Sequence, residues 1–180
     1  QDGEQMKRIS DKKSSKKIIF IMTLVGIVTF LMVIAKGYED VKAQENNNDI
    51  IPKPLNYEKG VGEFNLTKDT SIYVKGKNEK ETEEINKIAE FIKGKLQPAT
   101  GFELNIIKGD NPPQGNIYLT TIDGEESQGS EGYKMITNDQ GVKIIAFKPE
   151  GLSRGVQTLR QLLPADIAKN TVVNNVKWSV

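Results

Sequence analysis

The chain has 180 residues, with 25 lysines and arginines against 24 acidic residues, so its formal net charge is only +1. This balance speaks against a nucleic-acid-binding protein. The chain has no cysteine and no histidine, which excludes disulfides, Ser-His-Asp and Cys-His catalysis, and a histidine-based zinc site.

The N-terminal part of the sequence predicts export. Residues 7–17, KRISDKKSSKK, hold six basic residues and one acid, and residues 18–35, IIFIMTLVGIVTFLMVIA, hold no charge. Such a layout is typical of a signal peptide or of a transmembrane signal anchor, since 18 helical residues span about 27 Å. We expect residues 1–17 to be cytoplasmic. Residues 36–49 are polar and read as a linker. The remainder is then extracellular, either secreted or anchored.

The first helix of the globular part is expected after Asn78. Together with Glu81, this residue gives a capping-box pattern. Apolar residues at helical spacing continue to Leu96, and Pro98 and Gly101 are expected to end the helix.

Alternating and β-branched runs predict six strands in the globular part. They cover residues 71–74, 102–107, 116–121, 131–137, 141–148 and 176–180. The segment NDQG joins the fourth and fifth strands as a hairpin turn. Because the strands come in runs, residues 50–180 are expected to form one α+β domain with a mostly antiparallel sheet.

A second helix is predicted over EGLSRGVQTLRQLLP, residues 150–164. Four apolar residues share one face and are expected to point toward the sheet; they are Leu152, Val156, Leu159 and Leu163. Gly155 lies inside this helix, where glycine costs about 1 kcal/mol relative to alanine. A glycine tolerated there indicates a close backbone approach to a neighbour.

No catalytic motif appears in the sequence. Neither the Walker pattern nor GxGxxG is present. Glu125 and Glu126 lie in a glycine-rich loop and read as a solvated pair rather than as the two carboxylates of a glycosidase. Glu131 reads as a strand-edge hydrogen-bonding residue, and Arg160 as a helix-surface or interface residue rather than an anion site. The tyrosines at positions 57, 118 and 133 read as packing residues rather than sugar-stacking ones. We predict no catalytic residue, cofactor or metal site.

Several phrases occur in an order that points to one family. They are IIPKPLNYEKGVGEFNLTKDTSIYV at 50–74, LQPATGFELNI at 96–106, GNIYLTT at 115–121 and SEGYKMITNDQGVKIIAFKPEGLSRGVQTLRQLLP at 130–164. The chain here resembles the N-terminal domain of the β-N-acetylhexosaminidases of glycoside hydrolase family 20. The Glu-Gly-Tyr strand and the following Gly-x-x-x-Gly-Val-Gln-Thr-Leu-Arg-Gln-Leu helix are the most specific part of the match.

The resemblance implies a sheet with two helices on one face, standing before a TIM barrel that carries the family's Asp-Glu catalytic pair. In such enzymes the helices lie between the sheet and the barrel. The catalytic positions are not in this sequence, so no catalytic residue is carried over. The expected role is that of a non-catalytic domain supporting the barrel, inactive alone. The alternatives are a stand-alone surface module that binds glycan or a partner, and the N-terminal domain of a family 84 hexosaminidase.

If the helices lie between sheet and barrel, one side of them should form a docking face. Phe91, Gly155, Thr158 and Leu162 lie off the two sheet-facing stripes by helical geometry and are the predicted docking residues. The competing interpretation is that Phe91 and Leu162 pack within this domain.

Overall fold

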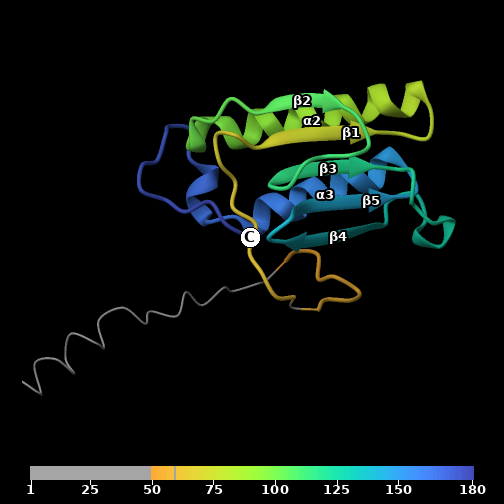
Figure 1. Cartoon of the computed structure of the whole chain (residues 1–180). Coiled ribbons are helices and arrows are strands. Elements are labelled where there is room, and N and C mark those ends of the chain that lie inside the picture. Colours follow the sequence, from red (N-terminus) through yellow and green to blue (C-terminus); the bar gives the residue numbers. More distant parts are fainter. Residues whose placement is uncertain (1–49, 59) are drawn as a thin grey trace, which may run out of the picture. The chain divides into compact units, whose positions relative to one another are not determined.

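The computed structural model describes residues 50–58 and 60–180, which form an α+β domain (Figure 1). The predicted basic flank, apolar run and linker, residues 1–17, 18–35 and 36–49, lie outside these residues. Within the described part, no helix combines the length and the apolar character needed to cross a membrane. In chain order the elements are β1 Ser71–Lys75, α2 Glu79–Thr100, β2 Asn105–Lys108, β3 Asn116–Thr120, the short 3-10 helix η1 Glu126–Gln128, β4 Tyr133–Asn138, β5 Gly141–Ala146, α3 Pro149–Leu162 and the 3-10 helix η2 Ala165–Ala168.

The five strands form one mixed sheet in the order β2-β1-β3-β5-β4. β1 runs parallel to β2 and β3, and β3 runs parallel to β5, while β4 is antiparallel to β5. The prediction of a mostly antiparallel sheet is therefore wrong. Helix α2 carries the chain back along the sheet between β1 and β2, so those neighbours become parallel, whereas the predicted hairpin turn makes β4 antiparallel to β5. The order of the strands in the sequence also does not predict that β3 pairs with β1 rather than with β2, the strand that precedes it.

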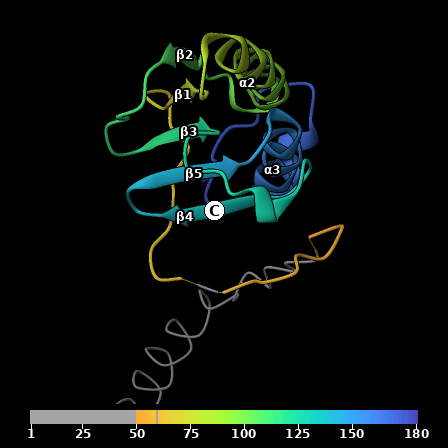
Figure 2. The same cartoon turned by 90° about the vertical axis from the view of Figure 1, so that its right-hand side faces the viewer.

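Both helices cover the same face of the sheet, as the family resemblance implied (Figure 2). Side chains alternate along each strand, so one set points toward the helices and forms the core. The buried apolar residues between sheet and helices include Ile72, Val74, Ile117, Leu119 and Ile144 from the strands and Ile85, Ile92, Leu152, Val156 and Leu159 from the helices. The predicted sheet-facing stripe of α3 is thus confirmed, and each such side chain contributes about 1.5–3 kcal/mol by its burial.

Helix α2 begins at the predicted cap. The side chain of Asn78 accepts a hydrogen bond of 2.9 Å from the backbone N–H of Glu81. Glu81 does not complete the predicted capping box, because its carboxylate is engaged elsewhere. It accepts a hydrogen bond of 2.6 Å from the Thr121 hydroxyl and one of 3.2 Å from the Lys77 N–H.

Helix α2 runs further than predicted, through Pro98 to Thr100. A proline leaves the carbonyl four residues before it without an intrahelical partner. That residue is Gly94, which is exposed, so its carbonyl is not buried without a partner. Gly101 then ends the helix in the left-handed conformation, with φ of 70° and its N–H bonded to Gln97 O at 2.8 Å.

The end of the chain pairs outside the main sheet. The predicted strand 176–180 forms only an isolated bridge, Asn65 to Ser179. Around it, Phe64 and Val180 exchange two backbone hydrogen bonds of 2.9 Å. Trp178 and Phe64 are buried in the core. This short antiparallel ribbon, residues 64–66 with 178–180, brings the beginning and the end of the domain side by side.

Candidate docking surface on the helices

The four predicted docking residues do not share one surface. Phe91 on α2 is 45% exposed, and Leu162 at the end of α3 is half-buried. Gly155 and Thr158 are buried. The helical wheel therefore misplaced two residues, because the buried side of α3 is wider than its leucine stripe.

Gly155 makes the close approach that its sequence position indicated, but toward the sheet. A Cβ atom built on Gly155 would overlap Cγ2 of Ile144 on β5 and lie 3.2 Å from the ring of Tyr133 on β4. A Cβ atom on Gly151, one turn earlier, would overlap the carbonyl oxygen of Gly132. The absence of side chains at these two glycines therefore allows the backbone of α3 to pack closely against β4, β5 and the residue before β4. Sequence periodicity could not show this, since the contacting strands are remote in the chain.

Thr158 also belongs to this contact. Its Oγ1 lies 2.5 Å from the hydroxyl of Tyr133, so the two form a hydrogen bond between α3 and β4. The interpretation of Tyr133 as a packing residue is confirmed. Tyr118 is buried as well, and burial raises the pKa of its hydroxyl.

The sides of α2 and α3 that point away from the sheet form what we call the outer helix face, which includes Phe91, Lys95, Arg154 and Gln161; all four residues are exposed. The Lys95 ammonium lies 5.5 Å from the centre of the Phe91 ring. Arg154 pairs with Glu131 at 3.0 Å, both exposed, so Glu131 serves an ion pair rather than a strand edge. The face therefore offers an aromatic ring among charged and amide groups.

Arg160 lies on the half-buried side of α3. Among the described residues, its Nε is a buried side-chain atom without a hydrogen-bond partner. A buried donor without a partner costs about 1–3 kcal/mol.

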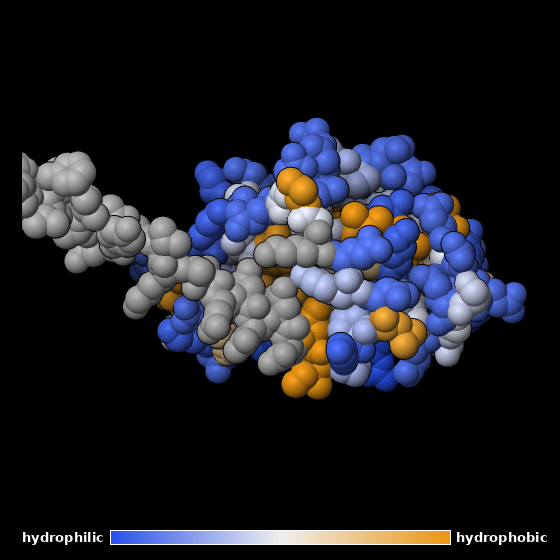
Figure 3. Space-filling view, turned by 90° about the horizontal axis from the view of Figure 1, so that it is seen from below, coloured by the Kyte–Doolittle hydropathy of each residue, from blue (hydrophilic) through white to orange (hydrophobic). Residues whose placement is uncertain are grey.

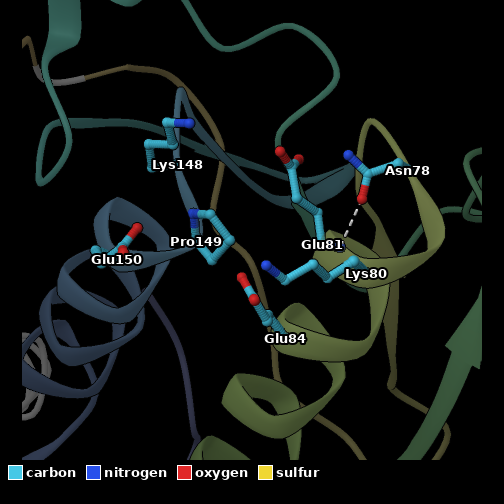
Figure 4. Close-up of a pocket in the computed structure, with 7 residues that line it drawn as sticks. All are labelled: Asn78, Lys80, Glu81, Glu84, Lys148, Pro149 and Glu150. Carbon is cyan, nitrogen blue, oxygen red and sulfur yellow. Dashed lines mark hydrogen bonds between the residues drawn. The ribbon is translucent and has the colours of Figure 1, made fainter.

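An open hollow of about 330 Å³ lies between the N-terminal ends of the two helices. Figure 4 shows the residues that line it, which are Asn78, Lys80, Glu81, Glu84, Lys148, Pro149 and Glu150. Two of these residues are lysines and three are glutamates, so the lining carries charges of both signs. Burial would raise the pKa of the Glu81 carboxyl, but the hydrogen bonds from Thr121 and Lys77 outweigh this and lower it. A general acid needs a raised pKa, so Glu81 is unsuited to that role.

The remaining carboxylates offer no better setting for acid-base chemistry. Glu125 and Glu126 are exposed, as predicted, and Glu125 accepts a hydrogen bond of 3.1 Å from Ser127. The carboxyl of Glu63 has a lowered pKa, chiefly because the Lys177 ammonium donates a hydrogen bond to it. Within residues 50–58 and 60–180, no group of three acidic side chains could hold a metal ion.

Comparison with known proteins agrees with this description. The family model described as glycosyl hydrolase family 20, domain 2, matches residues 47–177. A β-hexosaminidase of Porphyromonas gingivalis (strain ATCC BAA-308 / W83) is 30% identical over 145 residues, which are 79% of this chain and 18% of that protein.

Two solved structures are similar as well. One is the GH20 β-N-acetylhexosaminidase from Streptomyces coelicolor A3(2), with 34% identity and a TM-score of 0.63 over 74% of this chain and 25% of that one. The other is a mutant Streptomyces plicatus β-hexosaminidase in complex with product GlcNAc, with 32% identity and a TM-score of 0.63 over 74% of this chain and 24% of that one. The chain spans at most a quarter of the relatives it matches. It belongs to glycosyl hydrolase family 20, as the non-catalytic N-terminal domain that the family model calls domain 2.

Proposed function

We propose that this domain supports the TIM-barrel catalytic domain of an exported β-N-acetylhexosaminidase. The match of the family model over residues 47–177 carries the proposal. The relatives with this domain are named hexosaminidases, and most of their length lies outside the part matched here. The hydrolytic activity then belongs to the barrel, and the domain contributes a surface on which the barrel rests.

The outer helix face is the surface we assign to that contact, with Phe91 as its apolar centre and Leu162 at its margin. Phe91 is 45% exposed although it is a large aromatic side chain, and aromatic residues are enriched at the centres of interfaces. Gly155 and Thr158 support the contact indirectly. They determine how closely α3 packs against β4 and β5, and so where the outer helix face lies.

Export of the protein is part of the proposal. The basic segment 7–17 followed by the uncharged segment 18–35 supports it. The globular domain then lies outside the cell, either secreted or held to the membrane by residues 18–35.

Protease added to intact cells should digest an anchored domain, or the domain should appear in the medium if the segment is cleaved. Recovery of the full chain from the cytosol in protease-protected form would contradict export.

The decisive experiment compares the 180-residue chain with the full-length product of its gene. Both are assayed with a chromogenic N-acetylglucosaminide. We expect turnover by the full-length protein only, and a sequence after Val180 that encodes a barrel with an Asp-Glu pair. Turnover by the 180-residue chain, abolished by changing one of its carboxylates, would place an active site in this domain. A reading frame without a barrel would favour the stand-alone surface module.

A further inference from the structure

Exposed apolar side chains are concentrated in one segment near the start of the domain. We call the described residues 51–58 and 60–61 the strap. Leu55 and Val61 are fully exposed, Ile51 is 74% exposed and Tyr57 is 54% exposed. Single exposed hydrophobic residues are ordinary on protein surfaces, but four among these ten described residues indicate a surface that something else covers. Figure 3 shows hydrophobic patches on an otherwise hydrophilic side of the molecule.

The strap is fastened to the outer side of α3. The backbone N–H of Ile51 donates to Oε1 of Gln161 at 2.9 Å, and Nε2 of Gln161 donates to the carbonyl of Ile51 at 3.0 Å. Gln161 lies nine residues after Leu152, which is half a turn away around the helix at 100° per residue. Because Leu152 faces the sheet, the start of the strap is bonded to the side of α3 that faces away from it. In Figure 2 the first part of the strap, drawn in orange, lies below α3, on the side of the sheet that the helices cover.

The other end of the strap is fixed as well. A Cβ atom built on Gly62 would lie 3.1 Å from the backbone nitrogen of Asp139, so the chain passes tightly against the β4–β5 turn. Phe64, two residues later, is buried in the core. The strap is therefore held at both ends, while Leu55 and Val61 are fully exposed. A solvated tail would not need such fastening.

The position of Val180 points to what covers the strap. Val180 exchanges two backbone hydrogen bonds with Phe64, which is three residues from Val61. In a protein of the relatives' length, the polypeptide after Val180 starts beside the strap. Under the proposed function the same polypeptide covers the outer helix face, to which the strap is bonded at Gln161.

We propose that the strap is part of the interdomain contact, with Leu55 and Val61 buried against the catalytic barrel that follows Val180. This inference rests on the proposed function and adds to it a segment outside the two helices. Gln161 is the positioning residue that holds the strap in the contact.

The test uses the double variant Leu55→Asp/Val61→Asp in the 180-residue chain and in the full-length gene product. In the 180-residue chain the melting temperature should stay unchanged, because both side chains are already in water. In the full-length protein it should fall by several degrees. Ile122→Asp is the matched control. Ile122 is also exposed but follows β3 at the opposite end of the sheet, so its effect should be equal in both proteins.

A second measurement reports coverage directly. The chain contains no cysteine, so Val61→Cys places a single reporter thiol on the strap. Its reaction with a maleimide should be at least about tenfold slower in the full-length protein than in the 180-residue chain. A tenfold protection corresponds to a free energy of about 1.4 kcal/mol for exposing the covered thiol.

The possible outcomes separate the two proposals. Equal thiol reactivity and equal melting behaviour in an active full-length hexosaminidase would overturn the strap contact and leave the proposed function standing. A gene product without a barrel would overturn both. A concentration-dependent dimer of the 180-residue chain that Leu55→Asp/Val61→Asp dissolves would assign the strap to a second copy and overturn the barrel as its occupant.

Discussion

The hydroxyl of Tyr133 on β4 lies 2.5 Å from Oγ1 of Thr158 on α3, and the hydrogen bond between them ties the second helix to the edge of the sheet. One turn before Thr158, Gly155 allows the helix backbone to approach Ile144. The hydrogen bond and the glycine act on the same contact. Together they set where the outer helix face stands relative to the core.

Replacing Gly155 with alanine should destabilise the domain. The new methyl group would overlap Ile144, and overpacking of this kind costs about 1–3 kcal/mol. Gly94→Ala is the matched control, since Gly94 is an exposed helical glycine with nothing within 4 Å of an added Cβ. It should stabilise the domain by about 0.5–1 kcal/mol. Urea unfolding of both variants measures this, and equal effects of the same sign would contradict the packing role of Gly155.

Removal of the Tyr133–Thr158 hydrogen bond should cost about 1 kcal/mol. Tyr133→Phe keeps the ring and Thr158→Val keeps the side-chain shape, so each removes one partner. A double-mutant cycle on the free energy of unfolding should give a coupling energy of about 0.5–1.5 kcal/mol. Additive effects would show that the two hydroxyls do not stabilise each other.

Gln161→Ala should release the start of the strap without unfolding the domain. Ile51 then loses both hydrogen bonds to the carboxamide, and its backbone amide should exchange with solvent about five- to tenfold faster, as the loss of about 1 kcal/mol implies. Gln157→Ala, one turn earlier on α3, is the control and should leave that exchange rate unchanged. Hydrogen exchange followed by NMR or mass spectrometry distinguishes the two.

The carboxyl of Glu81 should make the domain more sensitive to acid. Its folded-state pKa is lowered, so its contribution to stability is present above the unfolded-state pKa of about 4.3 and is lost as the pH falls through the lower folded value. Glu81→Gln should reduce stability at pH 7 by about 1–2 kcal/mol and flatten the decline as the pH falls below the unfolded-state pKa of about 4.3. Thr121→Ser keeps the hydroxyl that donates to Glu81 and should retain the wild-type profile; unfolding free energies across this pH range provide the test.

Phe91→Asp tests the outer helix face. In the 180-residue chain the change should be nearly neutral, within about 0.5 kcal/mol, since the side chain is 45% exposed. In the full-length protein it should lower the melting temperature, because a buried unpaired carboxylate replaces an aromatic contact. Ile107→Asp, on the exposed part of β2, is the control and should act equally in both proteins. Strong unfolding of the 180-residue chain by Phe91→Asp would show that Phe91 packs within the domain.

The sequence by itself determined the local structure of this protein and its family. The cap at Asn78, the turn before Gly141 and the leucine stripe of α3 depend on residues close together in the chain, so their spacing was sufficient. The motif of the Glu-Gly-Tyr strand and the following helix identified the family without any knowledge of the fold.

Only the tertiary structure decided the strand directions, the orientation of Gly155 and the partners of Glu81. The parallel pairing of β1 with β3 and the contact of Gly155 with Tyr133 join segments that are remote in sequence. Glu81 accepts hydrogen bonds from the hydroxyl of Thr121, 40 residues later, and from the N–H of Lys77, the residue before the N-cap. Helical periodicity gives the direction of a side chain relative to its own axis. It does not give how wide an arc of the helix the neighbouring strands will bury, which is why Gly155 and Thr158 lie against the sheet.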